Sequence, residues 1–351
     1  MSSKGKKVLI GLLGAMNGIS GITASAAIIA YDSIFPRYER PNYDLYPGNY
    51  CYSRIDSNLP REEVTYKVKQ HKLRGHYYPS QINKGIVIIA HGIHAGGDDY
   101  LPIVEYVYHQ GFSVFSYNVT GTYESEGSGT IGMCQSIIDL EGTIKYIESD
   151  NRFKNTPIFL IGHSWGGYAV SSVLSLCQNI NACAVISGMN NGCTMMVDKA
   201  EEYVGKIGTL PGPIFNTYQR ILFKDYVDLN GVIGINTKDI PVLIAHGVDD
   251  KVIAFDKQAL IAQKENITNP NVEYYIGKGL NGDHDNIWHS IESCAYQLEV
   301  KSDLKLLEMK KNEKLTDEEK IEYYKTLNHK LYSEVNKELM DKIISMFNKT
   351  L

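Results

Sequence analysis

The chain has 351 residues, of which 43% are hydrophobic and 21% are charged, a composition typical of globular proteins and unlike that of disordered or collagen-like chains. Lysine and arginine number 35 against 40 aspartate and glutamate residues, a formal net charge of −5, so no basic field indicates a nucleic-acid partner. The six cysteines form no C-x-x-C pair and no zinc-ligand spacing. Pairs could form among them in an exported protein, but spacing alone does not define which cysteines pair.

The first 30 residues are predicted to be a membrane anchor or a signal segment. Three lysines precede an uncharged stretch, residues 8–30, that is long enough to cross a bilayer as a helix. The leading lysines favour a single-pass protein of the cell membrane with its body outside. The alternative is a signal cleaved near the small residues 24–26, which would release a secreted protein. Residues 31–60, rich in tyrosine, proline and charge, are predicted to be a membrane-proximal linker.

From residue 61 to about 290 the pattern predicts a sheet protein with helices on both faces. Residues 63–68 and 73–78 resemble the two strands of a hairpin. Short apolar runs then alternate with helix-length segments, and they lie at residues 86–90, 112–117, 158–161, 182–186 and 242–245. A last strand is predicted at residues 272–276. Continuous apolar runs are typical of strands buried on both faces of a parallel sheet. The predicted fold is therefore a mostly parallel, doubly wound α/β sheet.

The strand predicted at 158–161 is followed directly by the sequence Gly-His-Ser-Trp-Gly-Gly at residues 162–167. A strand-to-helix turn that presents a nucleophilic serine is too tight for side chains two positions before and after that serine. The glycines stand at those positions, so Ser164 is predicted to be a nucleophile at the carboxyl edge of the sheet. His163 is expected to point away from the hydroxyl and to be structural.

A serine hydroxyl needs a base that takes its proton and an acid that orients the base. Asp250 follows the strand at 242–245, and His284 follows the strand at 272–276. Both residues lie just past strand ends, where sites of open α/β sheets assemble. We rank Asp249 below Asp250, because Asp250 lies further into the loop. We rank His289 below His284, because His289 is expected to be a surface group in the following helix.

Ester or amide hydrolysis passes through an oxyanion that needs N–H donors. The backbone amides of Trp165 and Ile93 are predicted to supply them, since Ile93 lies in the glycine-rich loop after the strand at 86–90. His91 and His94 have the i, i+3 spacing of a metal pair, but no third ligand is nearby in the sequence. We therefore expect neither a metal nor another cofactor.

Together these motifs resemble the serine-hydrolase branch of the α/β-hydrolase superfamily, near the monoacylglycerol lipase, lysophospholipase and S33 aminopeptidase group. The resemblance covers about residues 60–290 and implies an α/β-hydrolase fold with an acyl-enzyme mechanism. Residues 118–127 resemble the loop after the family's fourth strand, with Asn118 in place of the usual aspartate and Tyr123 in place of a usual glycine. The N-terminal segment and linker resemble those of membrane-anchored hydrolases of Gram-positive bacteria.

Two regions lie outside the predicted sheet. Residues 188–240 are expected to form a helical cap whose apolar side chains line the substrate pocket. Residues 291–351 are predicted to be a helical extension that completes the core, with a capping box from Thr316 to Glu319. The lysine-rich part of this extension, residues 301–314, is expected to be solvated. Binding to a membrane surface or to a partner is the alternative.

The function predicted from these features is hydrolysis of a carboxylic ester, such as a lipid or a lysophospholipid, without a nucleic-acid partner. An S33-type aminopeptidase is the alternative within the enzyme class. A catalytically silent scaffold that binds a partner is the alternative from another class. The sequence does not define the oligomeric state.

Overall fold

A computed structural model describes residues 18–48, 50–55, 58–204 and 212–351. Within them the strands form one sheet in the order β1-β2-β4-β3-β5-β6-β7-β8. The bounds are β1 Glu62–Val68, β2 His71–Tyr78, β3 Ile86–Ala90, β4 Ser113–Tyr117, β5 Ile158–His163, β6 Ile180–Ile186, β7 Val242–Gly247 and β8 Val272–Gly277. β1 and β2 form an antiparallel hairpin, β2 pairs antiparallel with β4, and the other pairs are parallel. The predicted doubly wound, mostly parallel sheet is confirmed.

The strands of the sheet centre are buried on both faces, as their apolar runs predicted. In β3, Ile86 and Ile88 belong to the hydrophobic cluster on one face, and Val87 and Ile89 belong to the cluster on the other. Each predicted run agrees with its observed strand to within two residues at either end. The agreement is close because a strand buried on both faces needs an unbroken apolar sequence.

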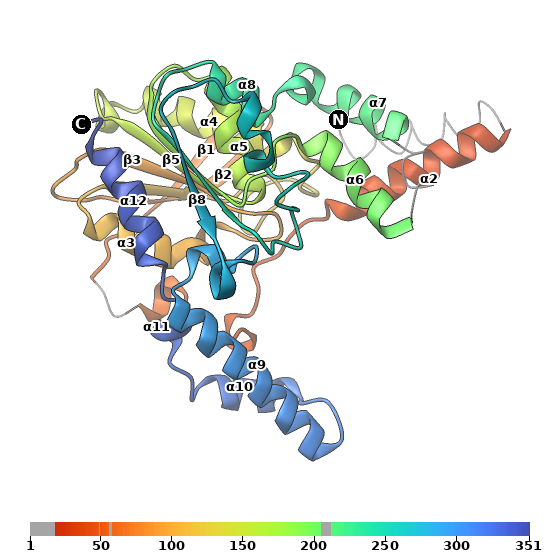
Figure 1. Ribbon diagram of the computed structural model, residues 1–351, viewed down its shortest axis with the longest axis vertical. Helices are drawn as coiled ribbons and strands as arrows, with labels where there is room; N and C mark the ends of the chain where they lie inside the picture. The colour runs from red at the N-terminus through yellow and green to blue at the C-terminus, as the bar shows by residue number, and fades with distance from the viewer. Residues whose placement is uncertain (1–17, 49, 56–57, 205–211) are drawn as a thin grey trace.

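Helices cover both faces of the sheet (Figure 1). α4 (Gln135–Ser149), α5 (Trp165–Ser172) and α8 (Gly231–Asn236) pack on one face, and α3 (Leu101–His109) and α12 (Lys337–Asn348) pack on the other. α12 buries Leu339, Ile343 and Phe347 against this second face. The spacing of three to four residues between these apolar side chains places them on one side of the helix, so the end of the C-terminal extension completes the core.

The predicted cap region lies between β6 and β7 and contains α6 (Gly192–Val204) and α7 (Gly212–Phe223). Both helices lie to one side of the sheet, together with α2 (Gly18–Ile34) (Figure 1). Tyr31 of α2 is fully buried, and its ring contacts Tyr218 of α7 edge-on with 5.5 Å between centroids. The Tyr218 hydroxyl donates a hydrogen bond to Asp32 at 3.0 Å. The C-terminal half of α2 is therefore packed against the cap.

The predicted membrane-spanning stretch, residues 8–30, falls partly outside the described residues. α2 contains its second part, and residues 1–17 are not described. Among the described residues, we find no helix that combines the length and the apolar character required to cross a bilayer.

The described part of the segment predicted to be a linker, residues 31–60, lies against the body that contains the sheet. Asp98, whose side chain is 5% exposed, accepts hydrogen bonds from Arg40 at 2.7 Å and from Arg61 at 3.1 Å. Arg37 donates to the carbonyl oxygens of Ser125 at 2.9 Å and of Gly127 at 3.0 Å. Buried charge and backbone hydrogen bonds therefore hold both ends of this segment on the loops above the sheet.

The loop at residues 118–127 accommodates its two departures from the family pattern. Tyr123 has a φ of 48°, a conformation that glycine adopts more easily than any other residue. Its hydroxyl donates a hydrogen bond to Asp99 at 2.5 Å. Asn118 accepts a hydrogen bond from the Gly97 amide at 2.8 Å and donates one to Glu124 at 3.0 Å. The side-chain hydrogen bonds of both residues therefore tie this loop to its surroundings.

The remaining helices of the C-terminal extension are α9 (Ile291–Lys311), α10 (Asp317–Tyr324) and α11 (His329–Tyr332). The predicted capping box is present at the start of α10. Thr316 Oγ1 accepts from the Glu319 amide at 3.3 Å, and the Glu319 carboxylate accepts from the Thr316 amide at 2.8 Å. α9 and α10 extend away from the sheet side by side (Figure 1).

Candidate active site

Ser164 lies on the sharp turn between β5 and α5, with φ 56° and ψ −117°. A β-carbon at Gly162 would lie 2.3 Å from the carbonyl oxygen of Gly166, and one at Gly166 would lie 2.0 Å from that of Ala90. Neither position has room for a side chain, so the two glycines permit the turn. A serine held in this strained conformation at a strand-to-helix junction has the geometry of a nucleophile elbow.

Asp250 and His284 form a buried pair at the same edge of the sheet. His284 Nδ1 donates a hydrogen bond to Asp250 Oδ2 at 2.7 Å, and each residue is 6% exposed. His163, adjacent to Ser164, donates through Nε2 to the carbonyl oxygen of His284 at 3.2 Å. The loops after β7 and β8 therefore bring the aspartate and the histidine together beside the turn that carries the serine, and the Nδ1 bond leaves His284 Nε2 for proton exchange.

Asp250 has a second histidine partner, which sequence reasoning missed. His246 Nε2 lies 3.0 Å from Asp250 Oδ2, and the amides of Val252 and Ile253 each donate to Oδ1 at 2.8 Å. Burial acts to raise the pKa of Asp250, but the hydrogen bonds from His246 and His284 outweigh it and hold the pKa below its ordinary value. Asp250 is therefore ionised at neutral pH.

The neighbours of Ser164 fix the position of the His284 loop. The Tyr100 hydroxyl accepts from the Gly92 amide at 2.9 Å and donates to His163 Nδ1 at 2.7 Å, so the ring proton of His163 is on Nε2. Burial, with a smaller contribution from His284, lowers the pKa of His163 to about 4, which keeps its imidazole neutral. His163 therefore links the elbow to the His284 backbone through hydrogen bonds.

The glycine-rich loop after β3 lies beside Ser164. A β-carbon at Gly92 would lie 3.4 Å from Ser164 Cβ, and Ile93 follows it in the chain. Trp165 is the first residue of α5, where amides lack partners within the helix. Within the described residues neither the Ile93 nor the Trp165 amide donates a hydrogen bond. Two amides without partners therefore flank the serine from different loops, an arrangement that can bind an oxyanion.

The lower-ranked acid and base lie away from this arrangement. Asp249 is exposed. His289 is 9% exposed and stacks on Trp288 with 3.8 Å between ring centroids, so the prediction of a surface group was wrong. The cause is that α9 begins at Ile291, after His289, and a β-bridge to Val335 directs the preceding turn into the core. Burial lowers the pKa of His289 to about 4.

Two groups of side chains have some features of a metal site. His91 Nδ1 bonds the Gly92 carbonyl at 2.7 Å and Nε2 accepts from the Val119 amide at 3.0 Å, so both nitrogens are occupied. Among the described residues, His163, His284 and Asp285 place ligand atoms within 4.8 Å of one another. Their histidine nitrogens already have the hydrogen bonds given above, apart from His284 Nε2. Neither group presents a set of vacant ligands for a metal.

A parallel sheet with a serine elbow after β5, a carboxylate after β7 and a histidine after β8 defines the α/β-hydrolase class. Residues 81–228 match the family model described as serine aminopeptidase, S33. The matched segment contains Ser164 and the loop after β3, and it ends before Asp250 and His284. No curated protein sequence matches the chain.

Solved structures of two enzymes are similar to the chain in fold. The esterase Pf2001 of Pyrococcus furiosus is 18% identical with a TM-score of 0.51, over 72% of this chain and 88% of that one. In another crystal form the same esterase gives 19% identity and a TM-score of 0.50, over 65% and 85%. Est1E of Butyrivibrio proteoclasticus, bound to ferulic acid, is 16% identical with a TM-score of 0.50, over 63% and 90%. This likeness shows that the chain has the α/β-hydrolase fold.

Proposed function

We propose that the protein hydrolyses carboxylic esters, of lipid or lysophospholipid type, through an acyl-enzyme intermediate. Ser164 is the proposed nucleophile, His284 the general base and acid, and Asp250 the residue that orients His284. The observation that carries the proposal is the 2.7 Å hydrogen bond from His284 Nδ1 to the buried, ionised Asp250, at the sheet edge where Ser164 occupies its strained turn.

In the proposed mechanism, His284 Nε2 takes the hydroxyl proton of Ser164 while Oγ attacks the ester carbonyl. The amides of Ile93 and Trp165 stabilise the negative charge that develops on the carbonyl oxygen. The imidazolium of His284, stabilised by the Asp250 carboxylate, returns the proton to the leaving alcohol. A water activated by His284 then hydrolyses the acyl-enzyme, so the cycle needs no cofactor.

The apolar character of the cap supports an ester substrate with an acyl chain. Met195 of α6 and Phe215 and Tyr218 of α7 are buried in the main hydrophobic cluster. A cap built from apolar side chains is suited to a substrate with an apolar group. The fold shared with the esterase Pf2001 adds support at the level of architecture.

An S33-type aminopeptidase is the second candidate, and the description of the matched family model favours it. Such an enzyme binds the free amine of its substrate, which requires negative charge near the scissile bond. A catalytically silent scaffold is the third candidate. In that case Ser164 of the wild type would react with neither substrate series and with no fluorophosphonate.

The first experiment measures hydrolysis by the full chain of p-nitrophenyl esters with increasing acyl length, with Ser164→Ala alongside. We expect turnover by the wild type, and a loss of at least about a thousandfold in the variant. Aminoacyl p-nitroanilides are assayed in parallel, and preference for them over every ester would favour the peptidase. Failure of the wild type to turn over either series and to label with a fluorophosphonate would favour the scaffold.

We further propose that residues 1–30 place the enzyme at the cell membrane with the hydrolase body outside, or direct its secretion after cleavage. Ile29 of α2 is 57% exposed, while Tyr31 is buried against the cap, so an anchor continuing from α2 would hold the cap close to the lipid surface. Fractionation compares the full chain with one that begins at Gly18 and retains the Tyr31 contacts. Recovery of the full chain in the soluble cell fraction, at its unprocessed mass, would refute both placements.

A further inference from the structure

Two cysteines from distant parts of the sequence meet where the cap joins the body. Cys134 is the N-cap residue of α4, on the body, and Cys193 is the second residue of α6, in the cap. With Phe223 and Val227 they form a small buried cluster separate from the two main clusters of the sheet. Cys134 is fully buried and Cys193 is 8% exposed.

The two side chains lie in the same buried cluster. The Tyr168 hydroxyl lies 3.8 Å from Cys134 Sγ. The preceding residues also approach closely, since a β-carbon at Gly192 would lie 2.9 Å from Met133 Cβ. Backbones this close leave the two side chains within reach of each other, and a disulfide requires the sulfurs to move to an S–S bond length of about 2.05 Å.

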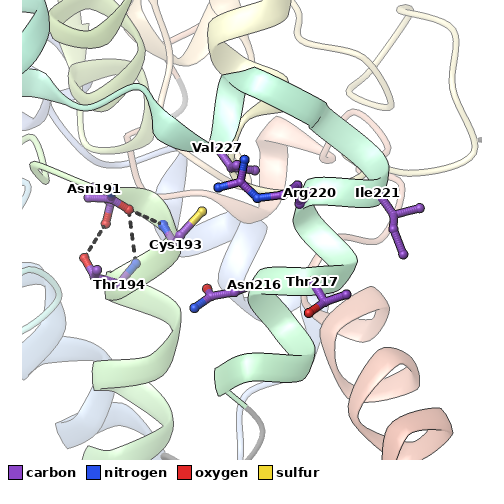
Figure 2. A pocket seen from close by; sticks show the side chains of 8 residues that line it. All are labelled: Asn191, Cys193, Thr194, Asn216, Thr217, Arg220, Ile221 and Val227. Carbon is purple, nitrogen blue, oxygen red and sulfur yellow. Dashed lines mark hydrogen bonds between the residues drawn. The ribbon is translucent and has the colours of Figure 1, made fainter.

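The two sulfurs differ in reactivity and access. The neighbouring Cys134 thiol outweighs burial and lowers the pKa of Cys193, with further contributions from Arg220 and Gln219. Cys193 also lines a cavity of about 470 Å³ between α6 and α7, together with Arg220 (Figure 2). A small disulfide in this cavity can therefore reach Cys193, whereas Cys134 is enclosed behind it.

We propose that Cys134 and Cys193 are a redox pair that forms a disulfide between the body and the cap. The Cys193 thiolate attacks one sulfur of a low-molecular-weight disulfide RSSR and releases one thiolate RS⁻, which takes up a proton. Cys134 then loses its proton to solvent and attacks Cys193 in the mixed disulfide, releasing the second RS⁻. Overall, two protein thiols are oxidised by two electrons, and RSSR is reduced to two RSH.

The bridge would act next to the proposed oxyanion site. Met133, adjacent to Cys134, accepts a hydrogen bond from the Trp165 indole at 2.7 Å. A disulfide would therefore tie the first turn of α6 to the same backbone that holds Trp165 in place. We expect the oxidised protein to have a cap that is fixed relative to Ser164.

The test uses the full chain, reduced, freed of reductant and incubated with oxidised glutathione. The protein is then denatured, alkylated with N-ethylmaleimide and analysed by mass spectrometry. The proposal expects four alkylated cysteines out of six and a peptide that links Cys134 to Cys193. Six alkylated cysteines, a link between other cysteines, or glutathione retained on wild-type Cys193 would each overturn it.

Two variants separate the roles of the sulfurs. Cys134→Ser is expected to retain glutathione on Cys193, because the second attack is lost, and Cys193→Ser is expected to retain none on Cys134. Cys183→Ser removes a buried thiol of β6 and is the matched control, which keeps the link. The Tm of the wild type is expected to be higher after oxidation, and that of Cys193→Ser unchanged. An equal rise in the Tm of Cys193→Ser would contradict the bridge. The wild-type peptide map decides the question even if a variant does not fold.

Discussion

His246 contacts the same carboxylate oxygen of Asp250, Oδ2, that accepts the hydrogen bond of the proposed catalytic histidine. The distance is 3.0 Å, and both side chains are completely buried. His246 Nε2 also lies 2.9 Å from the carbonyl oxygen of Ile253. Both neighbours of Nε2 are acceptors, so this nitrogen carries the ring proton. The carboxylate is therefore held from two sides, by a histidine of the preceding strand β7 and by one from the loop after β8.

Replacement of Asp250 by asparagine is expected to lower kcat for ester hydrolysis by about 10³ to 10⁴ with little change in KM, because the amide cannot stabilise the imidazolium of His284. Asp249→Asn is the matched control, since Asp249 is adjacent and exposed, and it should stay within about twofold of wild type. Steady-state kinetics on a p-nitrophenyl ester compare the two. A larger loss in Asp249→Asn than in Asp250→Asn would transfer the acid role to Asp249.

His246 is proposed to be a positioning residue. His246→Phe removes a hydrogen bond to a charged group, worth about 1.5–3 kcal/mol, so kcat is expected to fall about ten- to a hundredfold. With one donor fewer, the Asp250 carboxylate also holds the His284 imidazolium more strongly, so the acidic limb of the pH–rate profile should move to higher pH. His246→Gln retains an N–H donor and should recover part of both effects. An unchanged pH profile in a folded His246→Phe variant would leave His246 with a packing role alone.

The parts of the fold that followed from the sequence are those with a local pattern. The strands β3 to β7 were predicted because burial on both faces requires continuous apolar runs. The elbow at Ser164 was predicted because only glycine fits at residues 162 and 166, and the steric contacts at both positions bear out that reasoning.

The contacts that were missed join residues with no common pattern. Nothing in the sequence around Arg40 indicates that Asp98 is its partner, and Cys134 and Cys193 meet only after the cap has folded onto the body. His289 was misplaced for a related reason, since its burial depends on a bridge to Val335 in the C-terminal extension. Such contacts depend on tertiary packing, which periodicity does not encode.

Asp98→Asn tests how firmly residues 31–60 are attached to the body. The Arg61 side chain is 9% exposed and would lose the negative charge that compensates it, so we expect a loss of about 3 kcal/mol in the free energy of unfolding. Asp44 pairs with Arg54, and both side chains are more than 40% exposed, so Asp44→Asn should cost less than about 1 kcal/mol. Urea unfolding of both variants measures the two losses. Equal losses would show that the buried ion pairs of Asp98 stabilise the fold no more than the exposed pair of Asp44 and Arg54.

The last prediction concerns Asp139, which is fully buried in α4. It accepts hydrogen bonds from the amide and hydroxyl of Thr120, at 2.7 and 3.1 Å, and from Gln135 at 2.8 Å. Burial nevertheless raises its pKa to about 7, from an ordinary value of 3.8. The folded protein therefore binds more protons than the unfolded chain between about pH 4 and 7. The stability that Asp139 contributes is complete below about pH 4 and is lost as the pH rises through 7.

Asp139→Asn should remove this pH dependence. The difference in unfolding free energy between wild type and variant is expected to change by up to about 1.4 kcal/mol per pH unit between about pH 5 and 7, and to level off above. Asp150→Asn is the control, because hydrogen bonds from Arg152 lower the pKa of Asp150 to about 2, so its difference from wild type should be constant over that range. Urea unfolding at several pH values measures both differences. Parallel curves for wild type and Asp139→Asn would mean that the carboxyl group does not titrate in this window, and that its hydrogen bonds from Thr120 and Gln135 fully compensate its burial.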